Sequence, residues 1–400
     1  MFYVIIYIGD CMKKKKKIEK LEKNVFLPIT YIIIGFLLCL IVLYILAGRK
    51  NYIKLYYELK DYINAYDSIS SEFYDSIKKE EIINNSIDTM IKSVGDEYTT
   101  YSNKEEKDDF MDNLNGLYEG IGCTIVQIEN KIKVYSVTKN SPAEIAGLKK
   151  EDVIIKINNK SVENKKTEDI AKQIKSDKNK IITLTVMRDE KEKVIKIKKG
   201  EVEIPTVESK IYKEDNTTIG YIKISIFSSV TYKQFKKELE KMQKKENIDS
   251  LIIDVRNNSG GYLSSVTDIA SMFLEKNKTI YQLESNNKTT KIKDKTKEYT
   301  TYKIAVLINE NSASASEILA SSIKENYPQG IIIGTNSYGK GTVQKTKILS
   351  NESMVKYTIE KWLTPKGKWL NEKGLTPDVE VVNENDKEDK QLQSAIDKLK

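Results

Sequence analysis

The stretch Leu251-Ile-Ile-Asp-Val-Arg-Asn-Asn-Ser-Gly-Gly261 predicts an α/β fold for the second half of the chain. Residues 250–255 are largely branched and apolar, as a buried strand requires, and the polar run with two glycines after them predicts a loop. The same succession follows at 304–317, where the loop reads Asn309-Glu-Asn-Ser-Ala-Ser-Ala-Ser-Glu317, and at 331–344. Helical patterns separate these strands, so we expect βαβ units and a largely parallel sheet.

The three loops bring different chemical groups to one place. In a parallel sheet, the loops that follow the carboxyl ends of the strands lie along the same edge and can meet. The first loop offers glycine N–H groups, the second offers a serine at a helix start, and the third offers one lysine between Gly339 and Gly341. This edge is the candidate site.

Histidine is absent from all 400 residues, which excludes several classes of site. Ser-His-Asp and Cys-His arrangements and His-ligated metal sites all need it. Of the three cysteines, only Cys123 lies beyond the apolar segment described below, so neither a disulfide framework nor a Cys-rich zinc site is expected. The net charge of +8 is spread among interspersed acids from residue 49 onward, without the basic stripe that nucleic-acid binding needs.

Lysine is therefore the leading candidate to activate a serine, with carboxylates as the other choice. An amine can act as a base near neutral pH only if its pKa falls, and burial has that effect. The glycines on either side of Lys340 would allow the backbone to approach so that this side chain points inward. A tetrahedral intermediate also needs donors, which the N–H after the serine and a glycine N–H of the first loop could supply.

Plainer interpretations exist for the same residues. Ser314-Ala-Ser-Glu317 has the spacing of a capping box, so Ser314 and Glu317 could simply close a helix start. Most lysines are surface charges, and Lys340 could be one of them.

Residues 113–200 have the pattern of a small β-rich domain. Alternating strands at 121–128 and 131–137 are followed by the capped helix Ser141-Pro-Ala-Glu-Ile-Ala-Gly-Leu148 and further strands. This order, with Leu117-Tyr-Glu-Gly-Ile-Gly122, resembles a PDZ domain of the circularly permuted bacterial kind. Free backbone N–H groups at the turn Gly120-Ile121-Gly122 could receive a C-terminal carboxylate while the peptide adds as a strand, unless both glycines only shape a tight turn.

Four stretches carry a wider resemblance: the first loop with its strand, Ser312-Ala-Ser-Ala-Ser-Glu-Ile318, Ser337-Tyr-Gly-Lys-Gly-Thr-Val-Gln344 and Gly374-Leu-Thr-Pro-Asp-Val379. With them, residues from about 90 to 380 resemble the carboxyl-terminal processing peptidase family, peptidase family S41. Its members are serine peptidases with a Ser-Lys dyad and an embedded PDZ domain.

The resemblance implies a role for each matching residue. Ser314 would be the nucleophile, Lys340 the base and Gln344 the residue that orients the base. The N–H of Ala315 and that of Gly260 or Gly261 would form the oxyanion hole, and no metal or organic cofactor would be needed. Ser312 and Ser316 remain alternative nucleophiles, because the loop between the serine and the lysine is about one residue longer than usual.

A second departure lies at residue 97. Family members often carry proline where this chain has Glu97 in Asp96-Glu-Tyr98, and we expect this change to touch only the helical region.

An uncharged segment near the N-terminus predicts a membrane span. Phe26 to Ala47 is 22 residues of mostly apolar sequence, enough to cross a bilayer core, whereas a cleaved signal peptide is usually shorter and a core helix is rarely apolar on every side. Seven lysines between Lys13 and Lys23 precede it, so the positive-inside rule places the N-terminus in the cytoplasm and residues 49–400 outside, in a single-pass cell-membrane protein. We also expect translation to start at Met12 rather than Met1.

The expected whole is a membrane-anchored serine endopeptidase that cleaves exported or membrane-tethered proteins near their C-termini. Its expected partners are protein or peptide substrates with free C-termini, and the family likeness adds a homodimer formed through the N-terminal helices. The alternative is a catalytically silent PDZ scaffold that binds C-terminal peptides. The expected parts are a basic N-terminus (1–25), a transmembrane helix (26–47), a helical region (48–112), the PDZ-like domain (113–200), the Ser-Lys protease core (201–385) and a C-terminal helix or tail (386–400).

Overall fold

The computed structural model describes residues 14–15, 27–48, 52–297, 300–384 and 388–400. These divide into two units, Met1–Asn85 and Ser86–Lys400. The proposed start at Met12, and five of the seven lysines before the apolar segment, lie outside the described residues.

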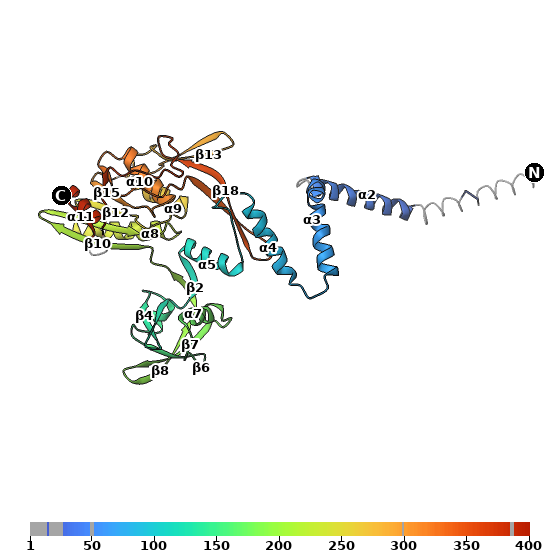
Figure 1. The fold of residues 1–400 in the computed structure, drawn as a ribbon, viewed down its shortest axis with the longest axis horizontal. Coiled ribbons are helices and arrows are strands. Elements are labelled where there is room, and N and C mark those ends of the chain that lie inside the picture. The colour runs from blue at the N-terminus through green and yellow to red at the C-terminus, as the bar shows by residue number, and fades with distance from the viewer. Residues whose placement is uncertain (1–13, 16–26, 49–51, 298–299, 385–387) are drawn as a thin grey trace, which may run out of the picture. The chain divides into compact units, whose positions relative to one another are not determined.

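The first unit consists of helices (Figure 1). Helix α2 (Leu27–Gly48) is apolar on all sides, and its 18-residue window Pro28–Ile45 is long and apolar enough to cross a membrane, although a signal sequence has the same properties. Helix α3 (Tyr52–Glu72) follows, and α4 (Lys79–Lys92) continues into the second unit. The two predicted amphipathic helices are confirmed, the second ending within a residue of the predicted Ser93.

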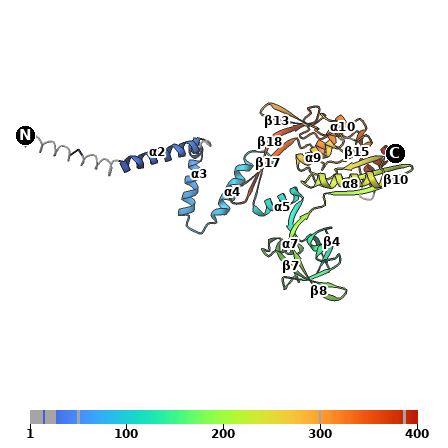
Figure 2. The same ribbon diagram turned by 180° about the vertical axis from the view of Figure 1, so that it is seen from behind.

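A six-stranded sheet in the order β10-β11-β12-β15-β16-β19 forms the centre of the second unit (Figures 1 and 2). Only the pair β10 and β11 is antiparallel, so the predicted largely parallel sheet is confirmed. The strands are β10 (Val207–Glu214), β11 (Thr217–Ile224), β12 (Ser250–Asp254), β15 (Lys303–Ile308), β16 (Gly330–Gly334) and β19 (Val379–Glu380).

Helices cover both faces of this sheet. On one face, α8 (Thr231–Glu246), α9 (Leu263–Ser271) and α10 (Ala315–Asn326) bury their apolar residues against alternate strand positions such as Ile253 and Val306. On the other face, α11 (Lys390–Leu399) packs against the intervening positions. Since both faces are covered, the strands are near-continuous runs of apolar residues.

A second, antiparallel sheet was not predicted. Its order is β1-β18-β13-β14, and β17 also pairs with β18. Strand β1 lies inside the region expected to be helical up to about residue 109, and it pairs with β18 more than 250 residues later in the chain. Helix α5 (Lys104–Asn115) follows it. The strands are β1 (Thr100–Ser102), β13 (Thr279–Ser285), β14 (Lys288–Lys293), β17 (Thr342–Ile348) and β18 (Met354–Leu363).

A separate antiparallel sheet in the order β3-β4-β5-β7-β8 builds the β-rich domain, with its own core of Ile, Leu and Val side chains. The short pair β2 and β9 joins it to the flanking chain. Strand β3 is at the edge of the sheet, and α7 contacts it. The elements are β2 (Leu117–Gly120), β3 (Cys123–Ile128), β4 (Lys131–Val137), α6 (Pro142–Ile145), β5 (Val153–Ile157), β6 (Lys160–Ser161), α7 (Thr167–Ser176), β7 (Ile181–Arg188), β8 (Lys191–Lys198) and β9 (Gly200–Glu203).

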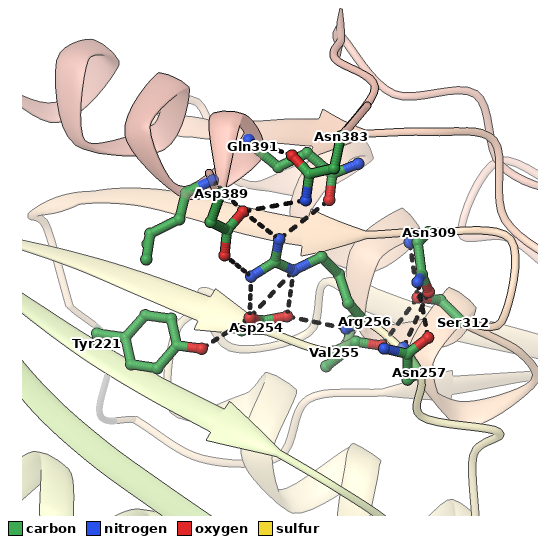
Figure 3. Close-up of polar contacts among 11 residues, drawn as sticks. Tyr221, Asp254, Val255, Arg256, Asn257, Asn309, Ser312, Asn383, Asp389 and Gln391 are labelled. Carbon is green, nitrogen blue, oxygen red and sulfur yellow. Dashed lines mark hydrogen bonds and ion pairs between the residues drawn. The ribbon is translucent and has the colours of Figure 1, made fainter. Parts of the chain in front are cut away.

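Arg256 fastens the C-terminal helix to the loop after β12 (Figure 3). Its guanidinium donates to both carboxylate oxygens of Asp389, at 2.6 and 2.8 Å, and to buried Asp254. Asp389 also accepts from the Leu392 N–H and so caps α11. Burial opposes ionisation of Asp389, but the hydrogen bonds from Arg256 and Leu392 outweigh it and lower its pKa from 3.8 to about 2.

We predict that Asp389→Asn removes an acid-sensitive part of the stability. Because the pKa of Asp389 is lower in the folded state, its contribution is complete above about pH 4 and is lost as the pH falls toward 2. The side chain is 39% exposed, so we expect a loss of about 1 to 2 kcal/mol at pH 7. Urea unfolding followed by tryptophan fluorescence should show wild type and variant converging as the pH falls from 4 to 2. Asp397→Asn, on the same helix, is the control, and a constant gap between Asp389→Asn and wild type would contradict the prediction.

Candidate active site

The loops after β12, β15 and β16 meet at the carboxyl edge of the sheet, as the sequence predicts. The three strands are consecutive neighbours in the sheet. The Ala313 N–H of the second loop donates to the Asn258 carbonyl of the first at 3.0 Å, and the Tyr338 N–H of the third donates to the Ser312 carbonyl at 3.0 Å. Main-chain hydrogen bonds therefore hold all three loops together.

Ser314 stands at the start of α10 in an unusual backbone conformation. Its φ of 56° and ψ of −112° lie outside the regions that L-residues ordinarily adopt. Such a conformation costs on the order of 1 to 3 kcal/mol and tends to occur at functional sites. Gly260 lies directly against it, since a Cβ on Gly260 would be 2.9 Å from the Ser314 Cβ and 3.0 Å from the Ala315 nitrogen.

The neighbouring serines have different surroundings. Ser312 and Ser316 are fully buried. The Ser312 hydroxyl donates to the Val255 carbonyl and the Ser316 hydroxyl to the Asn258 carbonyl, each at 2.8 Å. Both hydroxyls thus tie the second loop to the first, whereas Ser314 is only partly buried.

Glu317 joins the serine loop to the lysine loop. One carboxylate oxygen, Oε2, accepts the Ser314 N–H at 2.7 Å and the Lys340 N–H at 3.0 Å, and Oε1 accepts the Ser337 hydroxyl and the Gly339 N–H. The two nitrogens on Oε2 are therefore no farther apart than two hydrogen bonds laid end to end. Burial raises the pKa of Glu317, although all four donors favour its charged form. The predicted capping of the helix start by Glu317 is confirmed, and it is one of four bonds.

The backbone around Lys340 is fixed on both sides. Its carbonyl accepts the Trp362 indole N–H at 2.6 Å, and the Gly341 carbonyl accepts the Trp369 indole N–H at 2.9 Å. A Cβ on Gly341 would lie 2.5 Å from the Trp369 indole nitrogen, and one on Gly339, where φ is 89°, would lie 2.7 Å from a backbone nitrogen. Both glycines therefore permit the close approach that their positions suggested.

The Lys340 side chain lies on an aromatic ring. Its Nζ is 4.5 Å from the centroid of the Tyr98 ring, and among the residues that the structure describes no hydrogen bond joins it to the Ser314 hydroxyl. Burial, with a smaller contribution from the nearby charge of Lys356, lowers the pKa of Lys340. Asp96, Glu97 and Glu317 act in the opposite direction without outweighing the burial.

Residues 96–98 lie at the lysine, which corrects the expectation that the change at Glu97 touches only the helical region. The Asp96 carboxylate accepts the hydroxyl protons of Thr99 at 2.5 Å and of Thr358, on β18, at 2.6 Å. The reading of this stretch as part of a helix missed these contacts. The antiparallel pairing of β1 with β18 brings the segment here, and no local pattern in the sequence indicates that pairing.

Gln344 is on β17, close to the same threonine. Its side-chain N–H group donates to Thr342 Oγ1 at 2.9 Å and to Thr358 Oγ1 at 3.2 Å. Within the described ranges its carbonyl oxygen has no hydrogen bond, and none joins Gln344 to Lys340.

The candidate oxyanion donors differ in their present partners. The Gly260 N–H donates to Asn258 Oδ1 at 2.8 Å. No acceptor for the Gly261 N–H occurs among the described residues, and a Cβ on Gly261 would collide with the Phe227 carbonyl. Ala315 is the first residue of α10, where a helix has no internal acceptor for the N–H.

In the β-rich domain, Gly120, Ile121 and Gly122 link β2 to the edge strand β3. Ile121 is buried in the domain core, and its carbonyl accepts the Ala143 N–H at 2.7 Å. Gly122 has a φ of 83°, and a Cβ there would collide with Ser141. In the part of the chain that the structure describes, no three His, Cys, Asp or Glu side chains gather as metal ligands.

We predict that Glu317→Gln weakens the fold of the site. Glutamine would turn an NH2 group toward donors that now share a carboxylate oxygen, which leaves buried N–H groups unsatisfied. We expect a loss of about 2 to 4 kcal/mol in the free energy of unfolding. Glu325→Gln, near the end of the same helix, is the matched control. An unchanged melting temperature in Glu317→Gln would show that the four bonds do not hold the loops together.

Comparison with known proteins agrees with this architecture. Peptidase family S41 matches residues 218–381, and the PDZ domain family matches residues 120–198. The chain is 35% identical over 321 residues to a probable CtpA-like serine protease of Staphylococcus aureus (strain bovine RF122 / ET3-1), covering 80% of this chain and 64% of that protein. It is 36% identical over 327 residues to the carboxy-terminal processing protease CtpB of Bacillus subtilis (strain 168), covering 79% and 66%.

Among solved structures, a photosystem II D1 C-terminal processing protease is similar over 79% of this chain and 85% of that one. The TM-score is 0.46 and the identity 20%, values too low to bear on the site. The two sequence relatives are longer, since the chain spans about two thirds of their length or slightly less. On the sequence matches, the chain belongs to peptidase family S41 and carries a PDZ domain.

Proposed function

We propose that this chain is a serine endopeptidase that cleaves proteins near their C-termini through a Ser314-Lys340 dyad. One observation carries the proposal: the Glu317 carboxylate binds the Ser314 N–H and the Lys340 N–H with the same oxygen. It thereby couples a strained serine at a helix start to a lysine whose pKa is lowered by burial. The CtpA-like and CtpB proteases that the chain resembles support the same reaction.

In the proposed reaction, the neutral Lys340 amine takes the hydroxyl proton as the Ser314 oxygen attacks the scissile carbonyl carbon. The N–H groups of Ala315 and of the Gly260-Gly261 pair receive the oxyanion. When the intermediate collapses, the C–N bond breaks and the Lys340 ammonium gives its proton to the leaving nitrogen. Water then attacks the ester, Lys340 takes its proton, and the hydroxyl of Ser314 is restored. Before the attack, the amine must leave the Tyr98 ring for the serine.

Substrate tails are proposed to bind along the edge strand β3, beside α7. This edge is open in the sheet order, so a peptide can add as a strand while its carboxylate meets the turn Gly120-Ile121-Gly122. Peptides from an array should bind the full chain more weakly when their C-termini are amidated. Equal binding of both forms would contradict this part of the proposal.

The apolar helix α2 is proposed to anchor the chain in the cell membrane, with the N-terminus in the cytoplasm and the catalytic part outside. The length and composition of α2 and the lysines before it support an anchor rather than a cleaved signal. Full-length chain that carbonate at high pH released from membranes would contradict it. Pairing of protomers through α3 and α4 is an inference from family likeness, and ultracentrifugation in detergent would test it.

We predict that Ser314→Ala and Lys340→Met each reduce casein cleavage by the full chain by about 10³-fold or more, because the loss of either member of a dyad disables it. Lys361→Met is the matched control, since its Nζ also lies over an aromatic ring, 4.4 Å from the Trp369 centroid, outside the dyad. A catalytically silent PDZ scaffold predicts no cleavage even by wild type. Unchanged cleavage in both dyad variants would refute the dyad.

Adduct mapping distinguishes Ser314 from Ser312 and Ser316. A fluorophosphonate should modify Ser314, since the other two hydroxyls are buried and donate to carbonyls. An adduct on either neighbour would move the nucleophile there.

We predict that Lys356→Gln shifts the acid limb of kcat/KM for casein to higher pH. The base must be uncharged, so activity rises with pH through the pKa of Lys340, and the positive charge of Lys356 helps to lower that pKa. Removing the charge therefore raises the pKa and moves the limb upward. Lys345→Gln, on the neighbouring strand, is the control, and an unmoved limb in Lys356→Gln would show that Lys340 does not set it.

A further inference from the structure

Asp96 holds a hydroxyl that in turn holds Gln344. Its Oδ2 accepts a proton from Thr358 Oγ1 at 2.6 Å and from Thr99 Oγ1 at 2.5 Å, and its Oδ1 accepts the Tyr98 N–H at 3.3 Å. The carboxylate comes from the chain just before β1, and Thr358 lies on β18. The short contact thus joins residues 262 positions apart in the sequence.

The bond to Asp96 decides how the Gln344 amide is turned. A threonine hydroxyl has one proton, and Thr358 gives it to the carboxylate. Any other polar group that meets this oxygen must therefore donate to it, so the NH2 group of Gln344 faces Thr358. Thr342 Oγ1 accepts from the same NH2 group at 2.9 Å.

The Gln344 carbonyl oxygen is then directed away from the two threonines. It has no hydrogen bond in the described part of the chain. An amide oxygen is an acceptor only, so it can receive an N–H of the Lys340 amine and direct the lone pair of that amine elsewhere. A reversed amide would offer Lys340 a donor and could not do this.

Tyr98 belongs to the same short segment and supplies the surface on which the amine lies. The Lys340 Nζ is 4.5 Å from its ring centroid. The segment 96–98 therefore contacts the base directly through Tyr98 and reaches Gln344 through Thr358.

We propose that Asp96 is a positioning residue for the catalytic base, which acts through Thr358 to fix the Gln344 amide with its oxygen toward Lys340. The proposal rests on the proposed Ser-Lys function. It gives residues before the PDZ domain a role in catalysis that the sequence did not indicate.

The charged and titratable groups around Lys340 come from four places. Asp96, Glu97 and Tyr98 precede β1, Glu317 is on α10, Tyr338 is in the third loop, and Lys356 is on β18. Of these, Asp96, Glu97 and Glu317 raise the pKa of Lys340 and Lys356 lowers it.

Thr358→Val tests the relay, because it keeps the shape of the side chain and removes the hydroxyl. Loss of an outer partner of a catalytic group costs about 10- to 100-fold in activity. We therefore expect kcat for casein to fall by that factor with KM nearly unchanged, and Thr358→Ser to restore it. Thr346→Val, on β17 and outside the relay, is the matched control. Wild-type kcat in Thr358→Val would overturn the inference.

A double-mutant cycle separates the relay from a general effect on the fold. If Thr358 acts through Gln344, adding Thr358→Val to Gln344→Ala should cost little more than Gln344→Ala alone. Fully additive losses would overturn the inference even if every variant folds. If instead Ser314→Ala and Lys340→Met cleave like wild type, the proposed function itself fails.

Asp96→Asn provides a second readout. The asparagine oxygen can still accept from Thr358, so kcat should change less than in Asp96→Leu. Removing the carboxylate charge lowers the pKa of Lys340, so the acid limb should move to lower pH, opposite to Lys356→Gln. Equal losses in Asn and Leu variants with an unmoved limb would overturn the role of Asp96.

Discussion

The buried carboxylate of Glu317 is the constraint on which the site depends. Placing a charge away from water costs several kcal/mol unless donors replace the lost hydration. Here four donors do so, and they come from the helix start at Ser314 and from the loop that carries Lys340. If either loop withdrew, buried groups would be left unpaired. The geometry that brings nucleophile and base together is therefore maintained by the cost of desolvating one acid that takes no part in the proposed chemistry.

The same arrangement leaves the lysine side chain free to move while its backbone is fixed. Glu317 holds the N–H of Lys340 and Trp362 holds the carbonyl, so only the side-chain torsions can change. The Tyr98 ring attracts the amine mainly when it is charged, because a cation–π contact depends on the positive charge. Deprotonation weakens that contact at the moment when the amine becomes able to accept a proton. The ring can thus hold the protonated base away from Ser314 and release the neutral one.

The sequence predicted those parts of the site that depend on local pattern. Three strands ending in polar loops, the serine at a helix start and the lysine between two glycines are all properties of short stretches, and the structure brings them to one edge of the sheet. The antiparallel sheet was missed because its pairings join β1 to β18 across more than 250 residues. Glu317 was identified as a helix cap, which accounts for its bond to Ser314, but its bonds to the lysine loop follow only from the tertiary structure. Asp96, Tyr98 and Thr358 gave no local signal for the same reason.

The position of β1 means that the peptidase fold is interrupted by the PDZ domain rather than preceded by it. The family match covers residues 218–381, yet the surface under the lysine comes from Tyr98 and the outer strand of the antiparallel sheet from residues 100–102. The PDZ match at 120–198 lies between these two parts. A force or a bound tail that strains the connections at either end of the PDZ domain acts on a chain that returns directly to β1. Because Tyr98 is two residues before this strand, even a small shift there would change the contact between the ring and the amine. The base is therefore sensitive to the segment that precedes the PDZ domain, although that segment is distant from it in the sequence.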